Sequence, residues 1–521
     1  MDRATSNRRF DNGPSDPAED EDTPDGEGAV SGRPGTLARP ELARALSPLQ
    51  LFTIATGGIG VGWIIVVGDW LQQAGPLGAI TGFLAGAAII VPAALCYAEM
   101  ASSFPVTGGE MVYCYEVYGA AMGFGMGWFT VLAYVVITAF EAISIGWVMT
   151  GLVPGSEGPL LGTVAGQPLR AGSLAMGVLG TWGLAYINYR GINWSAKVQD
   201  ALSWIFLGAA SIFIATGVFG GSLSNLDPGF ARTASGAILP GILAVFLTTP
   251  NFLTGFAFVP QLMEELAPGS SARAAGPMLL SVIVRALFFC LVILACAMAV
   301  PWPTLVGTRL PAAEAFQTAF RSAVLAKVVL LAGFLGLVMV WNAVIISGSR
   351  VLFALGRARF LHPAFSRTQA GYRTPGVAIG FVALCATVGI FLGRRALIPI
   401  LTVTSAVQAA AFVLIAIGII RLRRSRPELP RPYRIRGGQS VAVVAAVGSA
   451  GALWLAITEP YKAVQRGIPL EWWIIVVWGV LGLLFWFLSR GTRLSVSEAE
   501  RRRLILGEVV VRSGGRPDQG Q

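Results

Sequence analysis

The chain has 521 residues, of which 54% are hydrophobic and 13% are charged, and its mean hydropathy is +0.66. A soluble domain of this composition would expose a very large apolar surface, so the composition excludes a soluble globular protein and predicts a polytopic membrane protein. The net charge of +10 reflects arginines in short segments between apolar runs. Because these arginines form no single basic face, they predict membrane topology and no binding of nucleic acid.

Residues 1–44 are predicted to be a disordered acidic tail, since most of this segment is rich in Asp, Glu, Gly, Pro and Ser. From Leu51 onward, apolar stretches of about 20 residues recur, each long enough to cross a hydrocarbon core of about 30 Å. Twelve membrane spans are therefore predicted, at 49–73, 78–100, 121–152, 171–188, 198–219, 237–263, 276–300, 324–347, 375–393, 396–420, 438–458 and 472–489.

Arginine-rich connections set the predicted orientation in the membrane. The connections 348–374 and 421–437 contain five and seven arginines, whereas 153–170 and 220–236 contain one each. The positive-inside rule then predicts a multi-pass protein of the cytoplasmic membrane with both termini in the cytoplasm. The predicted parts are the tail 1–44, a core 45–420 holding spans 1–10, a basic cytoplasmic loop 421–437, spans 11 and 12 in 438–489, and a cytoplasmic C-terminal tail 490–521.

The first span contains the stretch TIATGGIGVGWIIVVGDW (53–70), in which Gly58, Gly60 and Gly62 interrupt the apolar run. An unpaired backbone group is costly in lipid, so a broken helix persists only where it faces protein or a water-filled cavity. Glycine supplies the backbone freedom for such a break and lets a ligand approach the bare backbone. The alternative explanation is close helix packing through small residues.

A second interruption occurs five spans later, where Pro250, Gly255 and Pro260 fall inside the apolar run 237–263. Broken helices at matching places in two halves of a chain are typical of an inverted-repeat transporter with its site near the bilayer midplane. The sequence therefore predicts an all-α membrane fold of twelve helices. Spans 1–5 and 6–10 would form a five-plus-five inverted repeat with broken spans 1 and 6, and spans 11 and 12 would be appended.

Several motifs, in order along residues 45–440, resemble those of the amino acid–polyamine–organocation permeases. They are GGIGVGW in the first span; YAE, FP and TGGE in the second span and the loop after it; GFAFVPQLMEE in the sixth span; SGSRVLFALGRARFLHPAF and YRTPGVAI after the eighth; and ELPRPYRIRGG before the eleventh. The resemblance implies a fold of five plus five inverted spans and secondary transport that is not driven by ATP.

The two breaks predict a site for a zwitterion. Free N–H groups of the helix that begins after the first break suit a carboxylate, and free carbonyls at the preceding helix end and at the second break suit an ammonium group. Two aromatic side chains, Trp63 and Phe252, could cover the substrate or simply pack in the core. The predicted substrate-binding residues are Thr56, Gly57, Gly58, Ile59, Gly60, Val61, Gly62, Trp63, Asn251, Phe252, Thr254 and Gly255.

Other polar residues inside the spans are candidates for coupling or gating. A lone carboxylate such as Glu141 in the third span should face the bundle interior, where it could carry a proton, contact substrate or make a structural hydrogen bond. Asp69 could be a gate or a solvated charge, and Arg285 could pair with either carboxylate. Asn342 and Ser347 match polar positions of the resembled family and could line the site or bind an ion.

One position departs from the resembled family. Proton-linked relatives often carry a lysine in the fifth span, nine residues after a basic residue that Lys197 matches, and here that later position is Phe206. Proton cycling through an amine is therefore not expected there. The coupling ion would be H⁺ through Glu141 or Na⁺, and exchange or uncoupled transport stays open. Neither a cofactor nor a metal site is predicted, because the five cysteines lack metal-ligand spacing.

The sequence predicts a secondary permease and not an enzyme. Its predicted substrate is a small molecule, an amino acid or a related amine. A polyamine, organic-cation or amino-alcohol permease is the alternative within the same fold, and a nutrient receptor that signals through its tails is another. A membrane-embedded enzyme is disfavoured because the single histidine, His362, lies in a basic loop and no hydrolase or nucleotide-binding motif occurs. The substrate and the oligomeric state stay open.

Overall fold

A computed structural model describes residues 39–513 except 45, 58, 61, 165–166, 268–270, 394–395 and 464–466. The α-helices are α1 (Pro48–Gly57), α2 (Gly62–Ser103), α3 (Glu110–Tyr118), α4 (Ala120–Leu152), α5 (Ala171–Tyr189), α6 (Ile192–Gly220), α7 (Leu239–Leu253), α8 (Ala275–Ala299), α9 (Pro311–Phe320), α10 (Ala323–Arg357), α11 (Gly376–Ile390), α12 (Leu397–Ser425), α13 (Gly438–Ala463), α14 (Leu470–Leu488), α15 (Arg490–Leu494) and α16 (Glu498–Ser513). Five segments are 3₁₀ helices: η1 (Leu223–Leu226), η2 (Thr254–Glu265), η3 (Ser271–Ala274), η4 (Trp302–Leu305) and η5 (Pro363–Ser366). Two strands, β1 (Leu160–Val164) and β2 (Gln167–Arg170), complete the described elements.

Among the described residues, nine helices are long and apolar enough to cross a membrane, with α7 and η2 counted as one. The protein is therefore an integral membrane protein. The nine correspond to the predicted spans 2, 3, 5–8 and 10–12, and α2 also contains the second half of the predicted first span. The predicted fourth and ninth spans coincide with α5 and with the shorter apolar helix α11.

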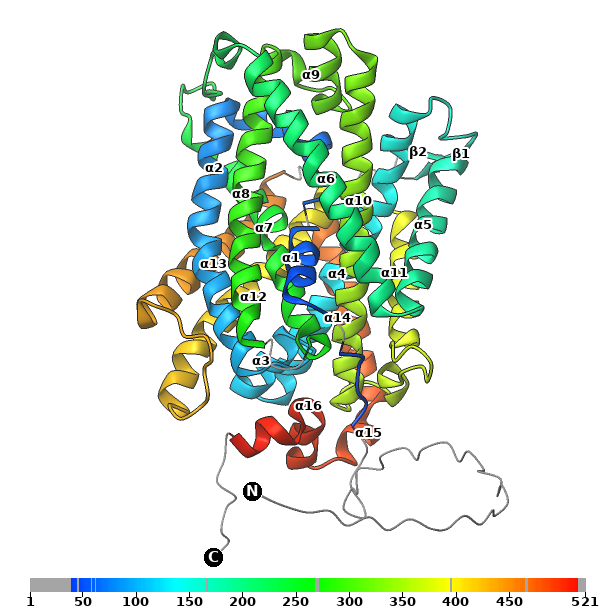
Figure 1. The fold of residues 1–521 in the computed structure, drawn as a ribbon, viewed down its shortest axis with the longest axis vertical. Helices are drawn as coiled ribbons and strands as arrows, with labels where there is room; N and C mark the ends of the chain where they lie inside the picture. The colour runs from blue at the N-terminus through cyan, green and yellow to red at the C-terminus, as the bar shows by residue number, and fades with distance from the viewer. Residues whose placement is uncertain are drawn as a thin grey trace, which may run out of the picture. The chain divides into compact units, whose positions relative to one another are not determined.

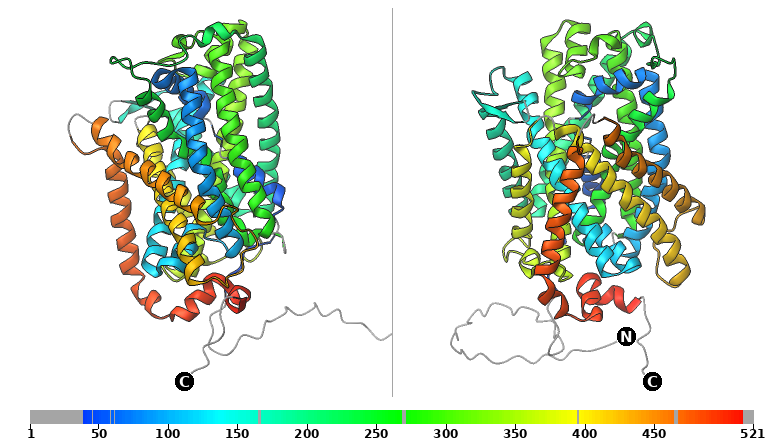
Figure 2. Two further views of the ribbon diagram at one scale, coloured as in Figure 1. Left: turned by 90° about the vertical axis from the view of Figure 1, so that its left-hand side faces the viewer. Right: turned by 180° about the vertical axis from the view of Figure 1, so that it is seen from behind.

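The long helices run roughly along the same direction, and the short elements gather at two opposite ends (Figure 1). One end carries α3, α15 and α16 and is called here the basic end; the other carries α9 and the β1–β2 hairpin (Figures 1 and 2). The described residues form a helical fold, as predicted, and a short hairpin lies outside the helices; its antiparallel strands pair Leu160 with Arg170 and Thr163 with Pro168. It forms in a connection, where polar and glycine residues end the apolar pattern of the spans.

The buried core and the exposed apolar residues divide the helices into inner and outer ones. Large side chains such as Trp63, Trp128 and Trp341 are fully buried among the inner helices. On outer helices, Phe219 of α6 and Trp454 of α13 are 88% and 67% exposed, as expected for side chains that face lipid. The peripheral helix α14 is attached to α4 by reciprocal hydrogen bonds, in which the indoles of Trp128 and Trp478 each donate to the other's carbonyl oxygen at 2.9 Å.

A sharp bend at Gly75 divides α2 into the second half of the predicted first span and the whole second span. Gly75 has φ +69°, a conformation that favours glycine, and Pro76 follows it. The loop 229–231 lies against this bend, because Leu77 N–H donates to Gly229 O and Ala231 N–H donates to Ala74 O, each at 2.9 Å. A Cβ atom at Gly75 would lie 2.6 Å from Ala231 N.

We predict that Gly75→Ala lowers the free energy of unfolding by at least about 1–2 kcal/mol, because the side chain meets both a left-handed backbone and the crossing loop. The measurement is thermal unfolding of the detergent-solubilised protein. Gly208→Ala is the matched control, since a Cβ there meets open space in the middle of α6. An unchanged melting temperature for Gly75→Ala would contradict the role of the bend.

Candidate functional site

The first span is interrupted between the end of α1 and the start of α2. Within this gap, 58–61, the structure describes Ile59 and Gly60, and the predicted site residues Gly58 and Val61 lie outside the described residues. Gly60 has φ +67°, so the chain turns here through a conformation that other residues rarely adopt. The break expected from the glycine pattern is therefore present at Gly60.

The second interruption is a change of helix type. The α-helix α7 ends at Leu253, and the chain continues without a gap as the 3₁₀ helix η2 from Thr254. Pro250 removes one backbone donor from α7, and Thr254 Oγ1 donates to Pro250 O at 2.6 Å. All residues of η2 are buried. A 3₁₀ helix has poorer backbone hydrogen bonds than an α-helix, so a segment of this length inside a membrane protein must be kept away from lipid.

The two interrupted spans lie side by side and run in opposite directions. Three contacts mark the pairing from the basic end inward: Leu46 N–H donates to Glu265 O at 2.8 Å, Ala55 O touches Gly255, and Phe252 packs on Gly62. A Cβ atom at either glycine would collide with its partner. Small residues at the breaks therefore let the two backbones meet in the middle of the bundle.

The two predicted aromatic covers are packed among other aromatic side chains. Trp63 is fully buried, and its ring centroid lies 5.1 Å from that of Phe213 and 5.9 Å from that of Phe288. Phe252 is 5% exposed and lies 5.0 Å from Trp70, centroid to centroid. Both rings flank the breaks, and in this conformation they contribute to the core around them.

Glu141 lies beside Gly60, and Phe206 lies beside Gly336, which faces Gly60. Glu141 Oε1 lies 3.3 Å from the position that a Cβ atom of Gly60 would take, and the carboxyl is 3% exposed. Its Oε2 atom has no hydrogen-bond partner among the described residues. Phe206, also buried, packs on Gly336 of α10, which in turn faces Gly60 O. The first break thus has a carboxyl on one side and an aromatic ring on another.

Asn342 belongs to a polar cluster that joins α5, α6 and α10. Its Oδ1 accepts from Asn188 Nδ2 at 2.9 Å and from Ser195 Oγ at 3.1 Å, and its Nδ2 donates to Gln199 Oε1 at 3.0 Å. The amide of Gln199 packs directly on Gly57 at the end of α1. This cluster therefore packs against the C-terminal end of α1.

The remaining predicted residues are placed as follows. Asp69 is exposed on α2, as a solvated charge would be, and does not meet the breaks in this conformation. Thr56 and Ser347 are fully buried, and the hydroxyl of each has no hydrogen-bond partner among the described residues. Asn251 Nδ2 donates to Leu401 O at 2.8 Å, which ties the second break to α12.

A small cavity of about 30 Å³ lies beside the second break. It is lined by α4, α7, η2, α8, α10 and α12 through Ala133, Tyr134, Ile137, Asn251, Thr254, Gly255, Phe258, Arg285, Val340, Val344, Thr404 and Gln408. Predicted site residues Asn251, Thr254 and Gly255 are in this wall. Ile137 is one helical turn from Glu141, so the same face of α4 serves the cavity and the first break.

Two buried ion pairs close the basic end of the second broken span. Glu265 binds Arg350, whose Nε donates to Oε1 at 2.7 Å, and both side chains are 1% exposed. Glu264 binds Arg357 at 2.7 Å and Arg39 at 3.1 Å. The pKa of Arg39 is lowered to about 10, chiefly by burial and then by the neighbouring Arg357.

The C-terminal helix α16 docks onto this end. Arg39 Nε donates to Leu504 O at 3.1 Å, and Arg501 Nε donates to Ala358 O at 3.2 Å. Glu116 of α3 accepts from Arg502 and, at 2.6 Å, from Arg426. The segment expected as a tail therefore contains two helices, and α16 is part of the packed structure.

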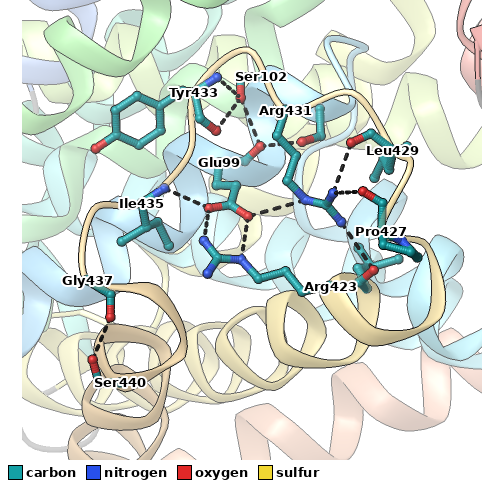
Figure 3. Close-up of polar contacts among 12 residues, drawn as sticks. Glu99, Ser102, Arg423, Pro427, Leu429, Arg431, Tyr433, Ile435, Gly437 and Ser440 are labelled. Atoms are coloured by element: carbon teal, nitrogen blue, oxygen red, sulfur yellow. Dashed lines mark hydrogen bonds and ion pairs between the residues drawn. The ribbon is translucent and has the colours of Figure 1, made fainter.

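Glu99 organises a second ionic cluster at the basic end (Figure 3). This buried carboxylate accepts from Arg423 Nε at 2.9 Å and from Ile435 N–H at 2.9 Å, and Arg431 Nε lies 3.5 Å from Oε1. Tyr433 N–H donates to Ser102 Oγ at 3.2 Å. The YAE motif and the ELPRPYRIRGG motif, far apart in the chain, thus form one structure that fixes the loop between α12 and α13.

The sequence reasoning assigned no role to Glu99 or Glu110, although both lie in motifs that it singled out. Glu110 begins α3 and accepts hydrogen bonds from Tyr97 Oη at 3.1 Å and from Gln261 Nε2 of η2. Burial raises the pKa of Glu110 to about 7. For Glu110, the available signal in the sequence was a carboxyl group inside a short motif that is followed by a buried helix.

We predict that protonation of Glu110 stabilises the fold. Its folded pKa of about 7 lies above the ordinary 4.5, so the free energy of unfolding should fall as pH rises from about 4.5 through 7, by on the order of 3 kcal/mol. Glu110→Gln should lack this component. Melting temperatures of both proteins between pH 4.5 and 8 check this, and parallel pH profiles would refute it.

We also predict that Glu265→Gln destabilises the protein by about 3–5 kcal/mol, because it leaves the guanidinium of Arg350 buried without its carboxylate. Glu157→Gln is the control, since its pair with Arg170 is more than one-third exposed and should contribute only about 0–1 kcal/mol. Thermal unfolding in detergent distinguishes them. Equal effects of the two substitutions would show that burial of the inner pair has no energetic consequence.

Comparison with known proteins identifies the family. A model of the amino acid permease family matches residues 46–485. Over 470 residues the chain is 26% identical to the branched-chain amino acid permease BcaP of Bacillus subtilis, covering 87% of this chain and 94% of that protein. It is 26% identical to the methylthioribose transporter of the same bacterium, covering 86% and 93% of the two chains, and 27% identical to the amino-acid permease RocE, covering 63% and 69%. The chain therefore belongs to the amino acid permease family.

Proposed function

We propose that this permease moves its amino acid by alternating access, through twelve spans of which 1–5 and 6–10 form inverted repeats. The antiparallel contact between the two broken spans supports this arrangement, because a two-fold axis in the membrane plane relates equivalent helices in opposite directions. In this scheme α1 with the first part of α2 is span 1, and α5 and α11 are spans 4 and 9.

The proposed orientation has the basic end in the cytoplasm of a plasma-membrane protein, with both termini there. The arginine-rich connections 348–374 and 421–437 support it through the positive-inside rule. The connections at the opposite end that contain the β1–β2 hairpin and residues 220–236 carry one arginine each. Closure of the basic end by ion pairs would then correspond to a state shut toward the cytoplasm.

The proposed substrate site lies where the two breaks meet, and their contact is the observation that carries the proposal. The substrate carboxylate would bind the free N–H groups at the start of α2, near Gly60 and Gly62. The ammonium group would bind carbonyl oxygens at the end of α1 and the buried Oδ1 of Asn251, which has no hydrogen-bond partner among the described residues. Thr56, Gly57 and Thr254 would complete the contact surface.

Glu141 is the proposed proton carrier. Its carboxyl lies beside the first break, where a change in access would expose it to one side of the membrane and then the other. Phe206 stands where some relatives have a titrating lysine, so an amine is not available at that place. Sodium binding by backbone carbonyls and Ser347 is the rival, since the Ser347 hydroxyl has no hydrogen-bond partner among the described residues.

The test is uptake of labelled amino acids into proteoliposomes, driven separately by an inward proton gradient and an inward sodium gradient. We predict that the proton gradient stimulates uptake by the wild type several-fold and that Glu141→Gln abolishes this stimulation, because the amide cannot carry a proton. Ser144→Ala is the matched control, since Ser144 lies about one turn further along α4 and is also buried.

The control should keep proton-driven uptake. Stimulation by sodium alone, or proton stimulation that survives Glu141→Gln, would refute the role of Glu141. Amino acid uptake that is absent under every gradient and in exchange would refute the transport site itself.

A further inference from the structure

We propose that Glu110 is a proton-binding site at the basic end of the permease, and that a proton bound there holds this end shut. Acidification of the cytoplasm therefore closes the permease. This inference rests on the proposed function, in which the basic end faces the cytoplasm and opens once in each transport cycle. The site is distinct from Glu141, which lies beside the first break.

The side chain of Glu110 joins α3 to α2 and to the broken span. It is 3% exposed, and it accepts hydrogen bonds from Tyr97 Oη of α2 at 3.1 Å and from Gln261 Nε2 of η2. A Cβ atom at Gly109 would collide with the side chain of Gln261, so the start of α3 packs directly on η2. Glu110 is therefore enclosed by η2, and a movement of η2 away from α3 would expose the carboxyl to water.

The same segment is held by an ion pair of the shut end. Gln261 lies one turn of the 3₁₀ helix before Glu264, which binds Arg357 at 2.7 Å. Thr107, just before α3, takes part in this contact, because its N–H donates to Glu264 Oε2 at 3.4 Å and its carbonyl accepts from Arg357 at 3.3 Å. Opening of the basic end has to separate η2 from this loop, and the separation takes Gln261 away from Glu110.

Glu110 has no cationic partner among the described residues. Its titratable neighbours are tyrosines and a cysteine, which are neutral at pH 7 because their ordinary pKa values are about 10 and 8.5. They are Tyr97 of α2, Tyr113 and Cys114 of α3, and Tyr134 of α4. Charged groups on the surrounding elements are paired with one another: Glu99 with Arg423, Glu116 with Arg426, Glu264 with Arg357 and Glu265 with Arg350. A carboxylate buried without a cation is costly, so Glu110 binds a proton more tightly while the end is shut.

The direction of the pH effect follows from this burial. In the shut state the pKa of Glu110 is about 7, above the ordinary 4.5 that an exposed carboxyl would have. The proton therefore favours the shut end fully below about pH 4.5, and this preference is lost as the pH rises through about 7. With the ordinary pKa in the open state, the ratio of open to shut molecules should rise about 20-fold between about pH 5.5 and 7.5.

The test measures access to the basic end through a cysteine at position 107, because the Thr107 side chain is fully buried in the shut state and its contacts with Glu264 and Arg357 use only its backbone. Full-length Thr107→Cys protein in detergent is treated with a water-soluble thiol reagent between about pH 5.5 and 7.5. Labelling of the native cysteines, measured without the substitution, is subtracted. Each rate is then divided by that of the exposed Ser425→Cys at the same pH, which removes the titration of the thiol itself. We expect the corrected rate to rise about 20-fold over this range.

Two substitutions and a control in the Thr107→Cys background identify the group that titrates. Glu110→Gln should be labelled slowly at every pH, because the neutral amide resembles the protonated acid. Tyr97→Phe should keep the pH dependence but move its midpoint upward by roughly one pH unit, because the carboxylate loses a donor. Glu428→Gln is the control, since this carboxyl is exposed in the loop between α12 and α13, and it should leave the profile unchanged.

A corrected rate that stays constant with pH, or that falls as the pH rises, would overturn the inference. A pH dependence that survives Glu110→Gln, or a midpoint that Tyr97→Phe leaves in place, would overturn it as well. Failure of the proposed function is distinct, because it is seen in proteoliposomes as a wild type that takes up none of the amino acids, whereas the labelling requires no transport.

Discussion

A helix that is interrupted in an apolar environment leaves backbone N–H and C=O groups without partners inside the helix, and these groups need partners elsewhere. In this permease the two broken spans pack against each other at their breaks. Gly255 lets the carbonyl end of α1 approach η2, and Gly62 lets the start of α2 approach Phe252 at the end of α7. The contact between the two breaks therefore depends on residues without side chains. The helices that surround it, with Gln199 below Gly57 and Glu141 beside Gly60, are positioned by this central crossing.

Buried charged side chains, like free backbone groups, also need partners. The carboxylates of Glu99, Glu264 and Glu265 are buried, and each meets arginines from segments distant in sequence. A buried pair of this kind contributes little beyond its desolvation cost while intact but is costly to break on one side. These clusters therefore specify which helix ends meet at the basic end.

The sequence predicted those parts of the structure that depend on local chemistry. Glycines at 58–62 and the proline and glycine near 250–255 indicated where the spans are interrupted, because backbone freedom and a missing donor act at their own positions. The change to a 3₁₀ helix at Thr254 was not predicted, since Pro250 and Gly255 indicated an interruption but not the type of helix that follows it. The bend at Gly75 lies in the predicted connection between spans 1 and 2, whereas its support by the loop from residue 229 onward could not be predicted from the sequence.

Pairings between residues far apart in the chain could not be predicted from a single sequence. Glu99 and Arg423 are 324 positions apart, and nothing in either motif indicates the other as its partner. The same holds for Asn342 with Asn188, and for the aromatic neighbours of Trp63, because rings of equal composition can pack in many ways. The roles of the predicted site residues remain predictions, although Gly57, Gly60, Gly62 and Gly255 are brought together at the crossing.

The docking of α16 has a consequence for how the protein is made. Arg39 precedes every span, whereas its carbonyl acceptor at Leu504 lies 465 positions later and follows every span. During synthesis all the helices that cross the membrane can therefore be inserted, and the two broken spans can meet, before the ionic closure of the basic end has its last component. Synthesis of α16 thus adds the last contacts to an end at which Glu264 and Glu265 already pair with Arg357 and Arg350.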